Sequence, residues 1–239
     1  MSVLSLTIKA NAKMTGHIRQ FFIQIGDLSN FAGRFFKEVF SPPFEFRELI
    51  RQCYQMGVLS LFLVGLTGFI IGLVLTLQSR PTLIEFGAVS WMPNMVGISI
   101  VREIGPVITA LICAGRIASG MGAELGSMRV TEQIDAMEVS GTNPFKYLVV
   151  TRILATTLML PLLVVFGDLI ALYGSALVEN IKGDVSFQLY FNTVFDALTW
   201  GDLIPATIKS FFFGFVIGLV GCYKAVSYTH LTLPTIYSV

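Results

Sequence analysis

Long apolar stretches dominate the chain and alternate with shorter polar ones. The first, from Gln52 to Ser79, carries no charged residue, and three more run over 86–115, 153–178 and 203–223 with one or two charges each. About 20 apolar residues are enough to cross the hydrocarbon core of a bilayer. The pattern therefore predicts an all-α integral membrane protein with four membrane helices, at 53–79, 88–115, 149–178 and 203–224.

Small residues recur at helical spacing within two of these stretches. Gly68 and Gly72 lie one turn apart in the first predicted span, and Gly214 and Gly218 lie one turn apart in the fourth. Pairs of this kind let two membrane helices approach closely. Both are therefore predicted to lie on helix-packing faces.

An amphipathic segment precedes the first span. Apolar residues recur at helical spacing between Ile18 and Phe40, with Arg19, Arg34 and Lys37 among them. A helix with this pattern lies in the plane of the membrane interface. We predict an interfacial helix over residues 9–45.

A polar, glycine-rich segment over 116–148 separates the second and third spans. From Met128 to Val139, the apolar residues Val130, Ile134 and Met137 lie at i, i+4 and i+7, and charged residues occupy the other faces. This spacing predicts one amphipathic helix, which Gly141 ends. Because acidic residues outnumber basic ones, we interpret the helix as a docking surface for another protein. A passive position on the lipid headgroups is the alternative.

The composition agrees with a membrane protein and excludes several functions. Hydrophobic residues make up 54% of the chain and charged residues 13%, and the mean hydropathy is +0.75. A net charge of +1 provides no field for nucleic acid. The three cysteines lack CxxC spacing, so no disulfide framework, metal site or cofactor is expected. No phosphate-binding Gly-x-x-x-x-Gly-Lys-Ser/Thr string occurs, so the chain is not expected to be an enzyme, and ATP-driven movement requires a partner.

Positive charge is unevenly distributed among the predicted loops. Residues 1–52 hold seven Lys and Arg residues and residues 116–152 hold four, whereas residues 179–202 hold one, Lys182, against four acidic residues. The positive-inside rule therefore predicts a cytoplasmic N-terminus and a cytoplasmic polar segment. Trp91 and Trp200 then both fall at the outer face, where interfacial tryptophans are common.

Three charged residues inside the predicted spans are candidates for function. At about 1.5 Å per residue from Pro93, Arg102 and Glu103 lie roughly 15 Å into the second span. A charged side chain facing lipid at such a depth costs about 2.5–3.5 kcal/mol. Pro106 has no N–H to donate to the Arg102 carbonyl, so polar backbone is expected at the same level. Lys209 lies in the fourth span.

We expect Arg102, Glu103 and Lys209 to line a lipid path, with Glu103 orienting Arg102. The structural alternatives are ion pairing with adjacent helices and, for Lys209, extension to the outer surface. Asp168, in the third span, is left without a role.

Three strings of the sequence resemble the MlaE/YrbE family of ABC-transporter permeases, which move phospholipids or related lipids between bacterial membranes. They are VREIGPVITALICAGR, GAELGSMRVTEQIDAMEVSGTNP and IKSFFFGFVIGLVGCYKA. The resemblance extends from about Phe21 to Ala225. It implies a homodimer in the bacterial inner membrane, with an N-terminal interfacial helix and five membrane helices in each chain. It also implies a cytoplasmic ABC ATPase that grips the polar segment, and a periplasmic MCE-domain lipid-binding protein.

The same resemblance suggests site residues at both faces. A lipid cavity at the end of the first helix and the start of the second includes Leu75, Leu83 and Phe86, for which helix packing is the alternative. The residues expected to couple to the ATPase are Glu124, Arg129, Glu132, Gln133 and Asp135.

The C-terminal end departs from the family pattern, in which a fifth helix follows. Residues 226–239 read VSYTHLTLPTIYSV, contain no apolar span and resemble a sequencing adapter translated in frame. We interpret them as a non-native tail that forms no membrane helix, and residues 1–225 as a single permease domain. A genuine divergent tail is the alternative.

Two other functions compete with a lipid permease. One is a secondary transporter or channel that uses Arg102, Glu103 and Lys209 as an ion relay. The other is a scaffold that transports nothing. The docking helix favours the permease because a channel has no need of one, and the cost of intramembrane charges disfavours a scaffold.

Overall fold

The computed structural model describes residues 22–42, 44–183 and 185–231 of the chain. The chain divides into two units, Met1–Phe44 and Glu45–Val239. In the first unit, residues 22–39 form a helix within the predicted interfacial segment. Residues 9–21 of that prediction lie outside the described residues.

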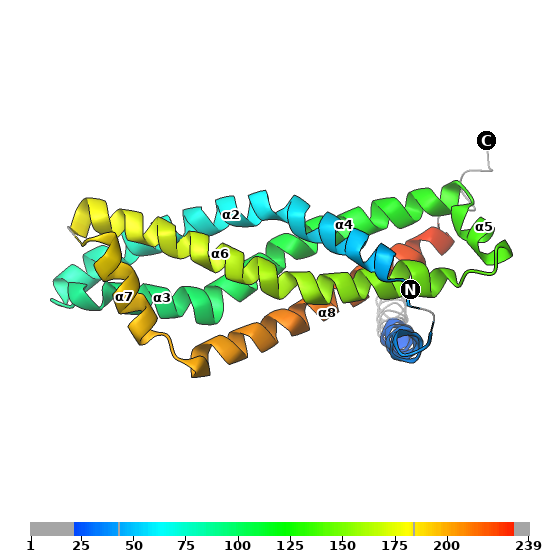
Figure 1. Cartoon of the computed structure of the whole chain (residues 1–239), viewed down its shortest axis with the longest axis horizontal. Coiled ribbons are helices and arrows are strands. Elements are labelled where there is room, and N and C mark those ends of the chain that lie inside the picture. Colours follow the sequence, from blue (N-terminus) through cyan, green and yellow to red (C-terminus); the bar gives the residue numbers. More distant parts are fainter. Residues whose placement is uncertain (1–21, 43, 184, 232–239) are drawn as a thin grey trace, which may run out of the picture. The chain divides into compact units, whose positions relative to one another are not determined.

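The second unit consists of long helices that alternate in direction (Figure 1). In chain order, its elements are α2 (Phe46–Glu85), η1 (Val89–Trp91), α3 (Met92–Ser99), η2 (Ile100–Ile104), α4 (Gly105–Val130), α5 (Gln133–Val139), η3 (Phe145–Val150), α6 (Thr151–Gly183), α7 (Phe187–Ala197) and α8 (Trp200–Leu231).

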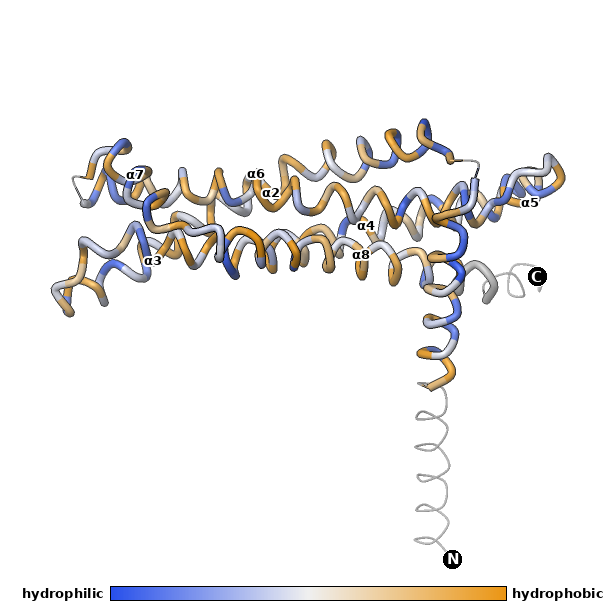
Figure 2. The backbone as a smooth tube through the Cα atoms, turned by 60° about the horizontal axis from the view of Figure 1, so that its bottom comes forward, coloured by the Kyte–Doolittle hydropathy of each residue, from blue (hydrophilic) through white to orange (hydrophobic). Residues whose placement is uncertain are grey.

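Four helical runs are long and apolar enough to cross a membrane, namely Phe46–Glu85, Val89–Val130, Phe145–Gly183 and Trp200–Val226. Together with the absence of strands among the described residues, they confirm the predicted all-α class and the number of spans. Figure 2 shows hydrophobic residues along these runs, with α5 at one end of the unit. We call this end the α5 end and the opposite end, which carries α3 and α7, the α7 end.

Glycines in the left-handed conformation end two helices. Gly87 and Gly141 have φ values of 65° and 77°. Beyond Gly141, the Thr142 N–H donates to the Met137 carbonyl at 3.0 Å, which is the Schellman arrangement. The predicted helix end at Gly141 is therefore confirmed, and Gly87 separates the first two membrane runs.

The polar segment is organised differently from the prediction. α4 continues to Val130, so residues 116–130 extend a membrane helix. Glu132 has a φ of 56° and interrupts the helix that was predicted over Met128–Val139. Ile134 and Met137 pack inward as predicted, but Val130 is exposed. The prediction of one helix is wrong because periodicity does not register a single left-handed residue between two helices.

α7 was not predicted, since residues 179–202 were interpreted as a loop. It has 11 residues, too few to span a membrane, so a search for apolar stretches misses it. Tyr190 and Val194 lie one turn apart on α7 and are buried against Met92 and Val96 of α3. α7 therefore packs against α3 at this end of the second unit.

Glycines bring the long helices into backbone contact. A Cβ on Gly72 of α2 would lie 1.9 Å from the carbonyl oxygen of Ala171 on α6. A Cβ on Gly218 of α8 would lie 2.2 Å from Oγ1 of Thr156, also on α6. Both predicted small-residue faces are thus packing faces, and both face α6.

The C-terminal residues continue a helix. α8 runs to Leu231, so residues 226–231 of the predicted tail extend it, and residues 232–239 lie outside the described residues. That these residues are non-native stays a prediction.

Replacing Gly72 by alanine should destabilise the protein by about 1–3 kcal/mol, the usual cost of overpacking a core. The added methyl group must push α2 away from the backbone of Ala171. Unfolding of the purified protein in mixed micelles by SDS measures the change. Gly115→Ala is the matched control, because nothing lies within 4 Å of a Cβ at this position of α4. An equal loss of stability in both variants would contradict the packing assignment.

Candidate functional site

The helical run that contains Arg102 and Glu103 changes geometry at these residues. Ile100–Ile104 form a π-helical segment, in which the Gly105 N–H donates to the carbonyl five residues back. Pro106 follows in the first turn of α4 and has no N–H to donate. π-helical turns within α-helices are rare and occur frequently at functional sites. The backbone thus departs from α-helical geometry where polar backbone was predicted.

Lys209 of α8 extends to this segment. Its Nζ lies 2.8 Å from Glu103 Oε1 and donates to the Arg102 carbonyl oxygen at 3.3 Å. One ammonium group therefore pairs with a carboxylate and also with the carbonyl to which Pro106 cannot donate. In the hydrocarbon core, such backbone groups must find their partners within the protein.

Arg102 pairs with a different residue. Its guanidinium lies 3.7 Å from Asp202 Oδ1, and Asp202 also accepts a hydrogen bond from the Thr199 hydroxyl at 2.7 Å. The predicted orientation of Arg102 by Glu103 is therefore wrong. Adjacent residues on a helix do not face each other, so the two side chains take different partners on α8. We call Arg102, Glu103, Asp202 and Lys209 the charge cluster.

Asp202 was not identified as a site residue from the sequence. It was counted only as an acidic residue of the loop before the fourth span. Asp202 and Lys209 are opposite charges seven residues apart, which places them on one face of a helix. Arg102 and Glu103 are also opposite charges, on adjacent residues. Together, the two patterns are the signal that could have revealed the pairing of Arg102 with Asp202 and of Glu103 with Lys209.

The charge cluster lies on the surface of the single chain. The side chains of Arg102 and Glu103 are 58% and 60% exposed, and that of Lys209 is 38% exposed. Arg102 lies about 15 Å along the helical run from the start of α3, and its partner Asp202 lies in the first turn of α8. Charged side chains on membrane-spanning helices face protein or water rather than lipid. The cluster therefore requires a covering surface or a polar cavity.

Asp168 of α6 is buried on the other side of the same helical run. Its Oδ1 has no hydrogen-bond partner among the described residues. A Cβ on Gly105 would come within 1.7 Å of this oxygen, so only glycine at position 105 lets α4 pack here.

The residues predicted to bind lipid at the α7 end differ in exposure. Leu75 and Leu83 are partly buried and pack against the core cluster that contains Met92 and Tyr190. Phe86 follows the end of α2 and is exposed. In the single chain Leu75 and Leu83 are thus helix-packing residues, and the lipid-binding role of all three stays a prediction.

Polar contacts join the helices at the α7 end. The Tyr190 hydroxyl donates to Ser175 Oγ at 2.7 Å, and Ser175 Oγ lies 2.6 Å from Thr76 Oγ1. Burial raises the pKa of Tyr190 to about 12, so its phenol stays protonated as a donor. Nearby, Arg80 of α2 forms an ion pair of 2.7 Å with the buried Glu179 of α6.

At the α5 end, three of the residues predicted to couple to an ATPase are exposed, namely Glu132, Gln133 and Asp135. Arg129 forms an ion pair with Asp135 across the break between α4 and α5. Glu132 has no ion-pair partner within the described part of the chain, and Gln133 carries no charge. Both side chains are therefore accessible to another protein.

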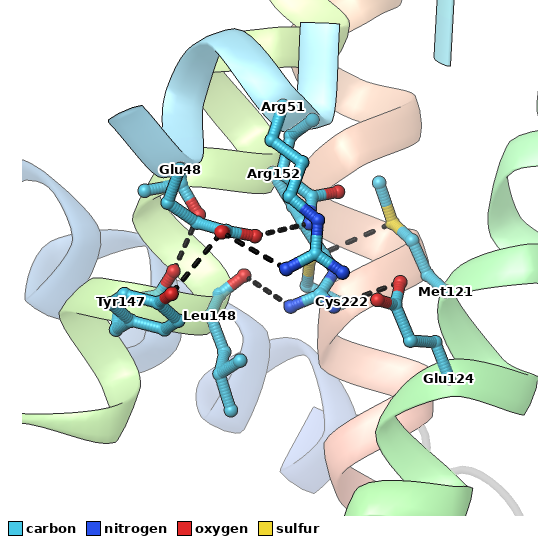
Figure 3. A network of polar contacts seen from close by, with 10 residues as sticks. Glu48, Arg51, Met121, Glu124, Tyr147, Leu148, Arg152 and Cys222 are labelled. Atoms are coloured by element: carbon cyan, nitrogen blue, oxygen red, sulfur yellow. Dashed lines mark hydrogen bonds and ion pairs between the residues drawn. The ribbon is translucent and has the colours of Figure 1, made fainter. Parts of the chain in front are cut away.

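Glu124, the remaining residue predicted to couple to an ATPase, is only partly exposed and pairs with a buried residue. Its carboxylate lies 2.9 Å from a guanidinium nitrogen of Arg152, whose side chain is 1% exposed (Figure 3). Arg152 also donates to the Leu148 carbonyl at 2.9 Å. In the same view, Glu48 of α2 accepts a hydrogen bond from the Tyr147 hydroxyl at 3.2 Å. Glu124 thus joins α4 to α6, and Arg152 was missed because a basic residue beside an apolar stretch resembles an ordinary interfacial residue.

These features define a class of protein. The second unit has four membrane-length helical runs, a charge cluster exposed on two of them and an exposed polar helix at one end. This combination is typical of a multi-pass membrane permease with an external partner.

Comparison with known proteins identifies the family. The family model described as Permease MlaE matches residues 49–232. A probable ABC transporter permease of Rickettsia prowazekii is 38% identical over 208 residues, which cover 87% of this chain and 80% of that protein. The intermembrane phospholipid transport system permease protein MlaE of Haemophilus influenzae is 32% identical over 177 residues, which cover 74% of this chain and 68% of that protein. The chain belongs to the MlaE family of ABC-transporter permeases.

A double-mutant cycle tests the link between η2 and α8. Lys209→Met should lower the amount of folded protein in the membrane several-fold, because it leaves Glu103 and the Arg102 carbonyl without their partner. Glu103→Gln should have a smaller effect, and the double variant should recover part of the loss. Protein level and lipid transfer are measured separately.

The matched control is the same cycle on Arg102→Gln and Asp202→Asn, whose contact is longer at 3.7 Å. It should show weaker coupling. Additive effects of the Lys209 and Glu103 changes would show that their contact does not join the two helices.

Proposed function

We propose that this chain is the permease subunit of an ABC transporter that moves phospholipids or related lipids between the inner and outer membranes of a bacterial cell. The observation that carries the proposal is the exposure of the charge cluster on two membrane-length helical runs. Such charges serve a polar substrate or a water-filled path far more often than they face lipid. The relative from Haemophilus influenzae, named for phospholipid transport, supports the choice of cargo.

The chemistry around the charge cluster suits a phospholipid. Arg102 and Lys209 can hold a phosphate through charge-assisted hydrogen bonds, while Glu103 and Asp202 keep the site close to neutral when it is empty. Exposed apolar side chains lie one or two turns along α4 and beside Lys209 on α8, and they offer a surface for acyl chains: Val107, Leu111, Ile208 and Phe212.

A second copy of the chain is the proposed cover for this surface. In a homodimer, two charge clusters enclose a shared cavity, and no charge is left facing lipid. The α5 end is proposed to face the cytoplasm, together with the N-terminus, because more basic residues flank the spans there. A periplasmic MCE-domain protein is proposed to receive lipid at the α7 end.

The energy is proposed to come from a cytoplasmic ATPase that binds α5. Glu132 and Gln133 expose polar side chains at the break before α5, and Ile134 and Met137 anchor α5 on the bundle through Leu125 and Leu148. A force on α5 is thereby applied to α4 and to η3, which leads directly into α6. The chain itself takes no part in nucleotide hydrolysis.

Replacing Glu132 by lysine should abolish ATPase binding and lipid-stimulated ATP hydrolysis by the reconstituted complex, because a charge at the docking surface is reversed. Glu132→Asn separates this effect from a backbone effect, since asparagine tolerates the left-handed conformation that residue 132 adopts. It should retain ATPase binding at a level between those of the wild type and the lysine variant. Binding is measured by co-purification, and activity by phosphate release and by transfer of fluorescent phospholipid between vesicles.

Glu85→Lys is the charge-matched control, because Glu85 is exposed at the end of α2, at the α7 end. It should leave ATPase binding unchanged. Normal ATPase binding by Glu132→Lys would contradict the docking assignment. Ion flux without lipid transfer in the intact complex would instead favour a channel or secondary transporter.

A further inference from the structure

A second polar feature lies between α2 and α4, toward the α5 end. A groove of about 630 Å³ opens there and is lined by Gln55, Met56 and Leu59 of α2 and by Arg116, Ser119 and Met121 of α4, among others. It is separate from the charge cluster, because Arg116 lies about 20 Å further along the same helical run than Arg102. No part of the proposed lipid path described above uses it.

Arg116 gives this groove an uncompensated positive charge. Its guanidinium donates to the hydroxyl of Ser60, a neutral partner on α2, and it forms no ion pair within the described part of the chain. The acidic side chain that lines the groove, Glu124, is engaged by Arg152 at 2.9 Å. The guanidinium therefore keeps donors available for an anionic ligand.

The depth of Arg116 matches a lipid phosphate. Trp91 is exposed at the α7 end, where interfacial tryptophans mark the level of one set of headgroups. Arg116 lies about 35 Å further along the same helical run, just beyond a hydrocarbon core of about 30 Å. It therefore lies at the headgroup level of the opposite leaflet.

The lining of the groove has the polarity of a phospholipid at this level. Gln55 and Ser119 offer hydrogen-bonding groups to a headgroup beyond the phosphate. Leu59 and Leu63 lie one turn apart on α2, are both exposed, and continue from the groove toward the membrane centre. An acyl chain can follow this face while the phosphate stays at Arg116.

We infer that the groove is a second lipid site, which binds the phosphate of a phospholipid from the leaflet at the α5 end. Arginine suits this role because its planar guanidinium forms paired hydrogen bonds to phosphate oxygens. The inference rests on the proposed function in taking a phospholipid as the ligand, and it adds a contact point in the leaflet opposite the α7 end.

Native mass spectrometry of the intact complex in detergent tests the site with defined lipids. Arg116→Gln should weaken retention of phosphatidylglycerol by roughly tenfold, the loss expected for hydrogen bonds to a charged group. Arg116→Lys should retain part of the binding. Arg51→Gln removes a charge from an α2 side chain that is 63% exposed and outside the groove lining, and it should have no effect. Diacylglycerol, which lacks the phosphate, should bind all variants equally.

A measurement that leaves Arg116 in place covers the case in which its variants fold poorly. A photo-crosslinking residue at position 59 should capture phosphatidylglycerol in vesicles made of that lipid. Capture of a second copy of this chain instead would overturn the inference, since the groove would then be a protein interface. Loss of the lipid crosslink on addition of inorganic phosphate alone would also overturn it, since the site would then bind free phosphate rather than a lipid.

Failure of this inference can be told apart from failure of the proposed function. Equal lipid retention by Arg116→Gln and the wild type, with normal lipid transfer by the complex, removes the second site alone. Arg116-dependent lipid binding in a complex that transfers no lipid removes the proposed function and leaves the site.

Discussion

A polar backbone group in the hydrocarbon core has no water to bond, so it needs a hydrogen-bond partner within the protein. The Arg102 carbonyl finds this partner in Lys209. Pro106 removes the backbone donor, and the π-helical segment Ile100–Ile104 changes the local register. The lysine comes from α8, so the same contact that stabilises the helix break also fixes α8 against it. The arrangement of both charge pairs follows, because Glu103 and Arg102 each face a different residue of α8.

Close backbone packing holds the remaining helices, because lipid chains are as apolar as the side chains and provide little hydrophobic drive between helices. α6 is the element that the others share: Gly72 places α2 on it and Gly218 places α8 on it. The buried Arg152, near the start of α6, binds Glu124 of α4 as well. A change in the position of α6 would therefore disturb contacts with three other helices at once.

Features that depend on local chemistry were predicted correctly from the sequence, whereas features that depend on tertiary partners were not. The number of spans follows from apolar length, the packing faces from paired glycines, and the polar backbone at Arg102 from Pro106. The choice of partner for Arg102 depends on which face of α8 lies near it. Neither the position of Arg102 along its span nor the free-energy cost of exposing its charge to lipid contains that information. α7 is too short for a membrane-length pattern, and the left-handed Glu132 leaves no periodic signal.

The continuity of α4 gives the two ends of the site a common element. The helical run that contains α4 carries Arg102 and Glu103 in η2, just before α4 begins, and Glu124 near the far end of α4. α5 packs beside that far end through Ile134 and Met137. A rotation or shift of α5 that displaces α4 must therefore also act on the contact between Glu103 and Lys209, unless the helix bends between them. The place where it bends most readily is the π-helical segment itself, which lies directly at the charge cluster. A movement of α5 is therefore either transmitted to the charge cluster or absorbed by bending of the π-helical segment beside it.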